Sequence, residues 1–335
     1  MFINRARMSP KRIVFPEGEQ PKILRAADVI VEEGIGTPIL VGSTEVITDW
    51  QKQLGLSLEG CVVVDPKHIP AGDLKIYVEE LWQHRQRHGV TRVEARKYLQ
   101  DPNYLAAMLV RMGQADAMVA GVAQHYPDTI RPALQLLSKR PGVNNVAAMY
   151  AIIFKERTIF LADTAVNVDH NEPEDLAEIA ILAADTVKRN FSVEPRVAML
   201  SFSNFGSVNH PEAKRVRKAT ELVKAMRPDI IVDGEMQADT AVDAQLLSTY
   251  PFSALQGGPA NVLVFPDMTS ANICSKLLLT LGGGEGIGPI LMGMNKTVHV
   301  LQRGCDVGEI VQVAAFAAVD AKESARKVAA KAVKA

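Results

Sequence analysis

The chain has 335 residues, 47% of them hydrophobic, and its 37 Lys and Arg residues nearly balance 38 Asp and Glu residues, for a formal net charge of -1. This balance excludes the strong positive field of proteins that bind nucleic acid or anionic membranes. No apolar run reaches the roughly 18 residues of a membrane-spanning helix, so we expect a soluble protein whose partners are small molecules or other protein chains.

The length of the chain, its first residues and its cysteines indicate the number of domains and the cellular location. A chain of this length exceeds the size at which single cores usually stop growing, so two domains are expected. The opening MFINRARMSPKRIVF lacks the apolar core of a secretory signal, which favours a cytoplasmic location. Cys61, Cys274 and Cys305 are widely spaced, which argues against a disulfide framework and a zinc site. We interpret them as buried or idle thiols.

Short Val- and Ile-rich runs recur along the chain and are typical of buried parallel strands. They are Arg12–Phe15, Pro38–Val41, Cys61–Val64, Asp116–Val122, Thr158–Ala162, Arg196–Ser201, Ile230–Val232 and Asn261–Phe265. Amphipathic stretches lie between them, at Gln20–Glu33, Tyr77–His88, Tyr104–Met112, Pro173–Arg189, Pro211–Met226 and Ser270–Leu281. This alternation predicts α/β layers with parallel sheets. We expect residues 1–140 and 295–335 to form one domain and residues 141–294 to form the other.

Polar segments follow several of the predicted strands, where open α/β sheets bind ligands. They are Gly121–Arg131, Ser201–Ser207, Asp233–Asp239 and Asp267–Asn272. Each alone is weak, because turns also favour Ser, Asn, Asp and Gly. Together with the loop that carries Arg303, they are expected to line one cleft between the two domains. The basic side chains along one face of Pro211–Met226 are interpreted as a solvated outer face.

Two arginines are candidates for binding an anion. Five glycines between Gly282 and Gly288 indicate a tight, ligand-facing turn, and Arg303 follows, with a guanidinium suited to forked hydrogen bonds with phosphate. The alternative is a glycine-rich connection with a solvated arginine. Arg131 is the second candidate, expected at the start of a helix, where anions also meet backbone amides.

No metal site is expected in the chain. The carboxylates Asp233, Glu235 and Asp239 are of a type that binds Mg²⁺, but no pair has a diagnostic spacing. A nicotinamide site is also not expected, because Gly282–Gly288 lies late in the chain and lacks the order of strand, GxGxxG and helix.

Taken in order, several motifs resemble the phosphate acetyltransferase (phosphotransacetylase) family over nearly the whole chain. They are RIVFPEGE at Arg12–Glu19, DAMVAG at Asp116–Gly121, DTIRPALQ at Asp128–Gln135, SFSNFGS, HPEAKRVRKATEL, DGEMQAD, ANVLVFPD, GPILMG and RGC. The resemblance implies acetyl transfer between coenzyme A and inorganic phosphate, by a homodimer. It also implies two three-layer α/β domains with mostly parallel sheets and an interdomain cleft, a fold similar to the isocitrate and isopropylmalate dehydrogenases.

The chain departs from the family pattern where the family implies chemistry. Gln302 replaces a serine before Arg-Gly-Cys, and Glu309 replaces an aspartate whose implied role is that of base on the thiol. His125–Pro127 stands where small hydroxyl residues are usual. Phe205 and Thr280 replace cationic residues. An added methylene of about 1 Å at the base can cost on the order of a hundredfold in rate, so these departures indicate weakened or lost catalysis.

The Tyr-Pro-Asp turn, the opening ARMSPKRIVFPEGE and VHVLQRG resemble more closely the C-terminal domain of large bacterial NADP-dependent malic enzymes. The resemblance implies a regulatory module of an oxidoreductase, which binds acetyl-CoA as an allosteric inhibitor and helps to assemble the oligomer. On this hypothesis NADP and a divalent metal belong only to malic domains outside these residues, and acetyl-CoA is an effector here.

The same hypothesis assigns the binding residues. Arg303 and Arg131 hold phosphates, Tyr126 occupies the former phosphate space, and Asn272 with Glu309 contacts the pantetheine end. Arg85 is a candidate for the ribose phosphate. Ser203, Asn204, Gly304 and Cys305 belong to the supporting loops.

Two alternatives stay open at this point. One is a working phosphate acetyltransferase in which Glu309 is the general base. The other is a purely structural dimerisation module with an empty cleft.

Overall fold

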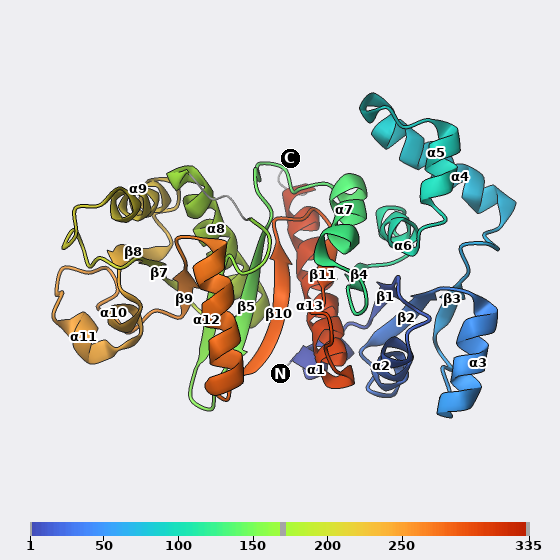
Figure 1. Ribbon diagram of the computed structural model, residues 1–335, viewed down its shortest axis with the longest axis horizontal. Coiled ribbons are helices and arrows are strands. Elements are labelled where there is room, and N and C mark those ends of the chain that lie inside the picture. The colour runs from blue at the N-terminus through green and yellow to red at the C-terminus, as the bar shows by residue number, and fades with distance from the viewer. Residues whose placement is uncertain (1, 168–171, 333–335) are drawn as a thin grey trace. The chain divides into compact units, whose positions relative to one another are not determined.

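The structure of the protein, a computed structural model, describes residues 2–167 and 172–332. The chain divides into two compact units: unit 1 comprises Met1–Arg140 and Met294–Ala335, and unit 2 comprises Pro141–Gly293. Each unit has one sheet with helices packed against it (Figure 1). Among the described residues, no helix is both long and apolar enough to cross a bilayer.

Unit 1 has a five-stranded, fully parallel sheet in the order β11-β4-β1-β2-β3. Its strands are β1 Lys11–Phe15, β2 Gly36–Val41, β3 Val62–Val64, β4 Ala117–Ala120 and β11 Thr297–Val300. Its helices are α1 Phe2–Arg7, α2 Pro21–Glu32, α3 Thr44–Leu54, α4 Ala71–Arg85, η1 Gln86–His88, α5 Arg92–Tyr98, α6 Pro102–Arg111, α7 Tyr126–Leu137 and α13 Val307–Ala332. Because β1, β4 and β11 are adjacent and parallel, the segments that follow them lie at one edge of the sheet.

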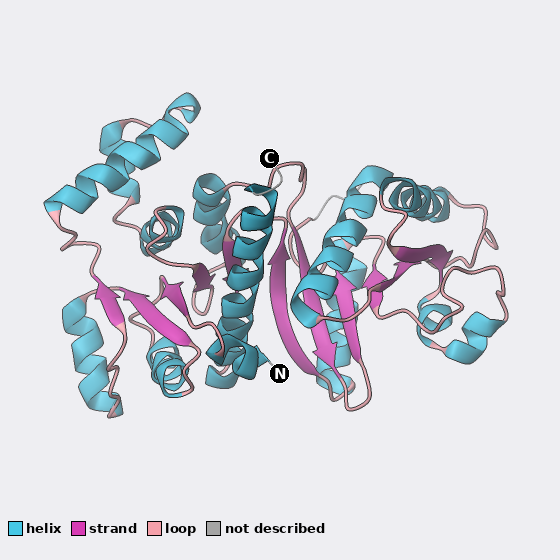
Figure 2. Ribbon diagram, turned by 180° about the vertical axis from the view of Figure 1, so that it is seen from behind, coloured by secondary structure: helices cyan, strands magenta, loops and turns pink. Residues whose placement is uncertain are grey.

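Unit 2 has a six-stranded mixed sheet in the order β10-β5-β6-β9-β7-β8. Its strands are β5 Ala147–Ile153, β6 Thr158–Ala162, β7 Arg196–Leu200, β8 Ile231–Met236, β9 Val262–Val264 and β10 Glu285–Met292. Its helices are α8 Pro173–Thr186, the π-helical η2 Val187–Phe191, α9 Pro211–Met226, α10 Ala238–Val242, α11 Ala244–Ser248 and α12 Met268–Leu281. Four strands are parallel, while β5 pairs antiparallel with both β6 and β10. Figure 2 shows the strands and helices of each unit from behind.

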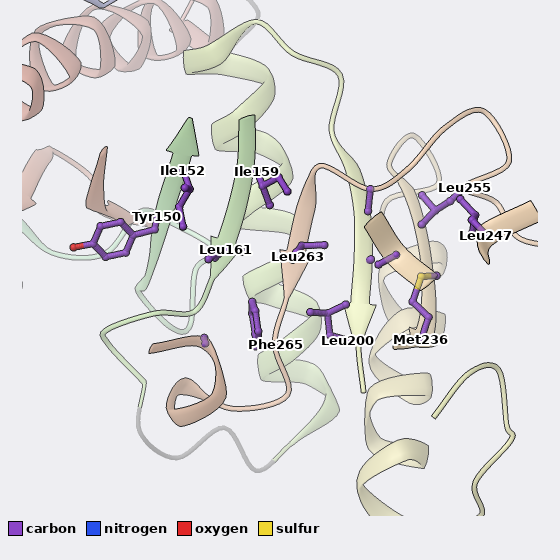
Figure 3. Close-up of a cluster of buried hydrophobic side chains, with 14 residues drawn as sticks. Tyr150, Ile152, Ile159, Leu161, Leu200, Met236, Leu247, Leu255, Leu263 and Phe265 are labelled. Carbon is purple, nitrogen blue, oxygen red and sulfur yellow. The ribbon is translucent and has the colours of Figure 1, made fainter. Parts of the chain in front are cut away.

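The buried cluster of unit 2 shows which helices cover one face of this sheet (Figure 3). Side chains of the strands, including Ile152, Leu161 and Leu263, pack with Leu247 of α11 and Ala271 of α12. Both helices therefore contribute to the same core, which removes these apolar side chains from water.

The prediction of a ligand-facing turn at Gly282–Gly288 is wrong. The segment enters β10, where Gly286 pairs with Ile152 of β5. The glycines are needed for close packing: a Cβ at Gly284 would lie 2.6 Å from Ile152, and a Cβ at Gly286 would lie 2.6 Å from Leu279 of α12. Gly288 has φ +152°, with the Tyr150 ring 2.9 Å from an added Cβ. These glycines therefore allow the edge strand β10 to pack closely against its neighbours.

Candidate active site

Three segments meet at the carboxyl edge of the unit 1 sheet, after β1, β4 and β11. The backbone N–H of Leu301 donates to the carbonyl of Ala120 at 2.6 Å, which joins the segments that follow β11 and β4. Gly121 has φ +106°, and a Cβ there would lie 2.8 Å from Val300 and 3.0 Å from the Leu301 carbonyl oxygen. Only glycine permits this close approach without strain.

Glu17, which follows β1, organises the loop that follows β4. Its Oε2 accepts from the backbone N–H groups of Gly121 and Val122 at 2.7 and 2.8 Å, and its Oε1 accepts from Ala123 and Gln124 at 2.8 and 3.2 Å. Glu17 is only 8% exposed. A buried carboxylate needs such compensation, because burial without partners is costly. The four bonds therefore fix the loop that leads into α7.

The segment after β11 presents Arg303 to solvent. Lys22 of α2 holds the neighbouring backbone, since its Nζ donates to the carbonyls of Gly304 and Cys305 at 3.2 and 2.7 Å. Gly304 has φ +89°, which glycine adopts readily. Arg303 is exposed, and within residues 2–167 and 172–332 its guanidinium has no hydrogen bond or ion pair. A free guanidinium on a held backbone is suited to bind an anion.

Glu309 lies in the first turn of α13, close to Arg303 in the sequence. Its Oε2 accepts from the Asp306 N–H at 2.8 Å, and its own N–H donates to Asp306 Oδ1 at 2.8 Å. This reciprocal pair is a capping box, which satisfies two free amides of the helix start. Burial, together with the charge of Glu309, raises the pKa of the Cys305 thiol to about 11. Cys305 is therefore a packed thiol and not a nucleophile at neutral pH.

Arg85 and Arg131 both act electrostatically on Tyr104 of α6. Arg85 ends α4, and its Nε is buried without a hydrogen-bond partner among the described residues. Arg131 lies in the middle of α7, 3.6 Å from Asp128, so its predicted position at a helix start is wrong. The helix begins at Tyr126, too early for Arg131 to share the amides of the first turn. Tyr126 is placed by its backbone, and its side chain lies outside the described part of the chain.

In unit 2, Ser203 and Asn204 belong to a loop after β7 that is held by a buried acid. Glu235 Oε1 accepts from the Ser203 hydroxyl at 2.9 Å and from the Gly206 N–H at 2.8 Å. Arg217 donates to both oxygens of Glu235 at 2.9 Å. Burial works to raise the pKa of Glu235, but these hydrogen bonds outweigh it and hold the pKa below its ordinary value. Asn204 exchanges hydrogen bonds with Gln237 at 2.8 and 2.9 Å.

The prediction that the basic side chains of α9 form a solvated outer face is wrong for Arg215 and Arg217, which bind other parts of the protein. Arg217 forms an ion pair with Glu235 at 2.9 Å. Arg215, with a side chain only 14% exposed, donates to the carbonyl of Pro266 at 3.0 Å. Fully solvated arginines would leave Glu235 without its charged partner. The helix thus braces the loops that follow β7 and β9.

Asn272 lies on α12, and its Nδ2 donates to the Thr164 carbonyl at 3.1 Å. The loop after β6 is arranged by Asp163, which is 1% exposed. The carboxylate of Asp163 accepts from the N–H groups of Ala165 and Asn167 at 3.1 and 3.0 Å, among others. Asn272 therefore contacts a loop with a fixed backbone.

Asp233 and Glu235 of unit 2 form ion pairs and hydrogen bonds within the protein. Asp233 and Glu235 lie inside strand β8, whereas the sequence placed them after a strand. Asp233 pairs with Lys224 at 2.7 Å and accepts from the Ser253 hydroxyl at 2.8 Å. In the described part of the chain, no three His, Cys, Asp or Glu side chains come together as a group that could hold a metal ion.

The candidate residues of unit 1 form two groups. Arg303, Gly304, Cys305 and Glu309 share one segment of the sequence, and Arg85 and Arg131 lie near Tyr104. Asn272, Ser203 and Asn204 belong to unit 2. Sequence reasoning missed Glu17 and Lys22 as supporting residues. Glu17 could have been identified from the sequence, because it directly follows a predicted buried strand and therefore lies at the carboxyl edge of the sheet, where ligands bind.

Buried acids hold loops in each of the two α/β units. Arg303, which has no protein partner among the described residues, lies six residues before the carboxylate of Glu309. These features define a class of protein that can bind an anionic ligand. The family profile of Phosphate acetyl/butaryl transferase matches residues 1–318, so the chain belongs to that family.

Individual relatives agree with this membership. The chain is 37% identical to the phosphate acetyltransferase of Thermoanaerobacterium thermosaccharolyticum, over 96% of this chain and 98% of that protein. It is 40% identical to the NADP-dependent malic enzyme of Escherichia coli, over 96% of this chain but 42% of that protein. The solved phosphotransacetylase of Streptococcus pyogenes is 36% identical with a TM-score of 0.89, over 96% of this chain and 98% of that chain.

These findings correct the expectation of a malic enzyme regulatory module. The chain spans less than half of the Escherichia coli malic enzyme, and likewise 45% of the phosphate acetyltransferase of Nitratidesulfovibrio vulgaris, so partial coverage does not single out malic enzymes. It matches other phosphate acetyltransferases over nearly their full length. The predicted assignment to an oxidoreductase and the predicted inhibitory role of acetyl-CoA are therefore wrong. The comparisons favour the alternative of a phosphate acetyltransferase. The same comparisons confirm the expected fold class of α/β units with mostly parallel sheets.

Proposed function

We propose that the protein is a phosphate acetyltransferase, which transfers an acetyl group between coenzyme A and inorganic phosphate. The single observation that carries the proposal is Arg303, an exposed guanidinium without a protein partner among the described residues, on a backbone held by Lys22. Such a group is available to a phosphate or a thioester oxygen. Membership of the family supports the reaction type.

The acyl group proposed is acetyl. Curated relatives that are 35% to 37% identical to this chain carry the name phosphate acetyltransferase. A solved branched-chain phosphotransacylase from Enterococcus faecalis is only 17% identical, and that likeness concerns the fold alone.

Four of the residues singled out in the sequence are assigned to coenzyme A. Arg303 and Arg131 are assigned to phosphates, and Arg85 to the ribose phosphate, since its buried Nε lacks a partner among the described residues. Asn272 is assigned to the pantetheine end. A buried guanidinium N–H without an acceptor is costly, and a bound phosphate oxygen would satisfy it.

Glu309 is the proposed base. In the direction of acetyl-CoA synthesis, Glu309 takes the proton of the coenzyme A thiol, and the sulfur attacks the acetyl carbon of acetyl phosphate. The C–O bond to phosphate then breaks, and the departing phosphate takes up that proton. Only Oε2 of Glu309 is engaged with Asp306, so Oε1 has no hydrogen bond among the described residues. A positioned general base typically contributes a factor of 10² to 10⁴ in rate.

The test is Glu309→Gln, because glutamine preserves the capping box while it removes the base. We expect the initial rate of phosphate-dependent coenzyme A release from acetyl-CoA to fall by about 10² to 10⁴, with an unchanged melting temperature. Glu32→Gln, a substitution of another helical acid in unit 1, is the matched control. A Glu309→Gln variant with the wild-type rate would contradict the assignment of the base.

Two further properties are part of this proposal. We expect a homodimer, as the family resemblance implies. We also place the protein in the cytoplasm, because its three cysteines are all unpaired thiols, as is usual in reducing compartments.

A further inference from the structure

Gln124 lies in the loop that follows β4 and directly precedes His125, the N-cap residue of α7. Its backbone is held, because its N–H donates to Glu17 Oε1 at 3.2 Å. Its side chain is held as well, because its Oε1 accepts from Nδ2 of Asn103 in α6 at 2.5 Å. Two residues from different parts of unit 1 therefore fix the backbone and the side chain of Gln124 separately.

Asn103 sets the orientation of the Gln124 amide. Because Oε1 is bonded to Asn103, the NH₂ group occupies the other side of the amide, and among the described residues Nε2 has no hydrogen bond. Gln124 is partly exposed, so this group is open to a ligand. An amide NH₂ carries two N–H donors. Gln124 therefore presents a fixed pair of donors to an oxygen-rich ligand.

Asn103 is unfavourable for the stability of the fold. It is only 2% exposed in the first turn of α6, and its own Oδ1 is buried without a partner among the described residues. A buried acceptor that lacks a hydrogen bond destabilises a protein. Leucine has a similar size and would leave no acceptor unpaired. Stability alone gives no reason for an asparagine at this position, whereas the orientation of Gln124 does.

Gln124 lies near the reacting end of the proposed substrates. Glu17, which accepts from its N–H, is also close to Cys305: burial is the main cause of the raised pKa of the Cys305 thiol, and the charges of Glu309 and Glu17 both add to it. The proposed base and the acid that holds Gln124 are therefore near the same sulfur atom. The phosphoryl group that reacts beside the coenzyme A thiol is that of inorganic phosphate, since the phosphates of coenzyme A lie at the opposite end of that molecule.

We propose that Gln124 binds inorganic phosphate through its side-chain NH₂ group, and that Asn103 is a positioning residue that orients this amide. The inference rests on the proposed phosphate acetyltransferase activity and adds a residue to the phosphate site. A fixed donor pair holds the phosphate in one orientation, and the correct orientation of a reactant raises the rate of its reaction.

The first experiment is Gln124→Glu. Glutamate has the same length and keeps an oxygen for Nδ2 of Asn103, but its carboxylate has no N–H to donate. We expect the KM for phosphate, measured by coenzyme A release from acetyl-CoA, to rise by about 10- to 100-fold, as the loss of a hydrogen bond to a charged group predicts. The KM for acetyl-CoA should stay at the wild-type value.

Gln114→Glu is the matched control, because it introduces the same charge at the opposite end of β4. Gln114 also accepts a side-chain hydrogen bond, from the Tyr77 hydroxyl. It precedes β4 and therefore lies at the amino edge of the sheet, away from the edge where ligands bind. We expect its KM for phosphate to be unchanged. An equal rise in both variants would show that the added charge, and not the lost donor, is responsible, and would contradict the inference.

Asn103→Asp tests the orientation of the amide. A carboxylate at this position accepts but does not donate, so the Gln124 amide must turn and bind it through Nε2. The first turn of a helix favours the ionised carboxylate. The contact between the two side chains is kept, but an oxygen of Gln124 then faces the phosphate. We expect the KM for phosphate to rise as in Gln124→Glu, whereas a purely structural contact would leave it unchanged.

Circular dichroism and thermal melting establish that the variants are folded, and Gln124→Glu, at a partly exposed position, keeps the inference testable if Asn103→Asp does not fold. A wild-type chain without phosphate-dependent release of coenzyme A would contradict the proposed function itself. An active wild type with an unchanged KM for phosphate in Gln124→Glu, or with a raised KM for acetyl-CoA in its place, would overturn this inference alone. A rise in Gln124→Glu but not in folded Asn103→Asp would overturn the positioning role of Asn103.

Discussion

The structure predicts that Glu17 is needed to hold the loop that follows β4. Glu17→Gln keeps the size of the side chain, but its amide nitrogen cannot accept a hydrogen bond. Two of the four N–H donors, either Gly121 and Val122 or Ala123 and Gln124, would then face an NH₂ group. A hydrogen bond to a charged group contributes about 1.5–3 kcal/mol. Losing two bonds, with partial relaxation of the loop, should lower the free energy of unfolding by about 3 kcal/mol.

The assay combines urea unfolding with hydrogen exchange of the loop amides, measured on Glu17→Gln and on Glu19→Gln. Glu19 is the control because it lies in the same PEGE segment, is exposed and accepts one bond, from the Ser43 N–H at 2.7 Å. We expect faster exchange at residues 121–124 and an acetyl-transfer rate lower by about a hundredfold, since small displacements at a site are costly. Unchanged protection of these amides in Glu17→Gln would show that Glu17 does not hold this loop.

Three further predictions follow from the described contacts. Arg303→Ala should raise the KM for acetyl-CoA or phosphate by about 10- to 100-fold in steady-state kinetics. Arg303→Lys should restore only part of the loss, because lysine lacks the planar guanidinium of arginine. A KM for Arg303→Ala equal to that of the wild type would contradict the role of Arg303 in binding. Glu235→Gln should destabilise by about 3 kcal/mol near pH 7, reduced by the 38% exposure of Arg217. Because the folded pKa of Glu235 lies below its ordinary 4.5, this stabilisation is complete above that pH and is lost as pH falls through the folded pKa. Urea melts should show the difference between wild type and Glu235→Gln shrinking as the pH falls below 4.5. With its pKa raised to about 11, Cys305 should react with iodoacetamide at about pH 8 far more slowly in the folded chain than in urea, and equal rates would show that it is not buried.

Strong local patterns predicted the regular elements well. The helix expected at Pro211–Met226 is α9 with the same bounds, and the strand expected at Thr158–Ala162 is β6. β5, β10 and β11 were missed. All pairings of β5 and β10 are antiparallel, and the glycines of β10 were interpreted as a turn. Their strand conformation depends on pairing with each other and on the space beside Ile152 and Leu279, which no local pattern contains.

The candidate site was predicted only in part. Arg303 was identifiable because its neighbours are glycine and other loop residues, and the structure leaves it exposed. The roles of Glu17 and Lys22 depend on contacts more than a hundred residues distant in sequence, such as Glu17 with Val122 and Lys22 with Cys305. Arg217 was read as solvated because its partner Glu235 is on the next strand. Long-range partners of this kind cannot be inferred from spacing.

The proposed activity is tested by an assay of the purified chain with acetyl-CoA and inorganic phosphate. Free thiol and acetyl phosphate are measured in the same reaction. We expect both products to form in equal amounts, only when phosphate is present, and about 10² to 10⁴ times more slowly with Glu309→Gln. A folded wild-type chain that releases no thiol in response to phosphate would contradict the proposal that this protein is a phosphate acetyltransferase.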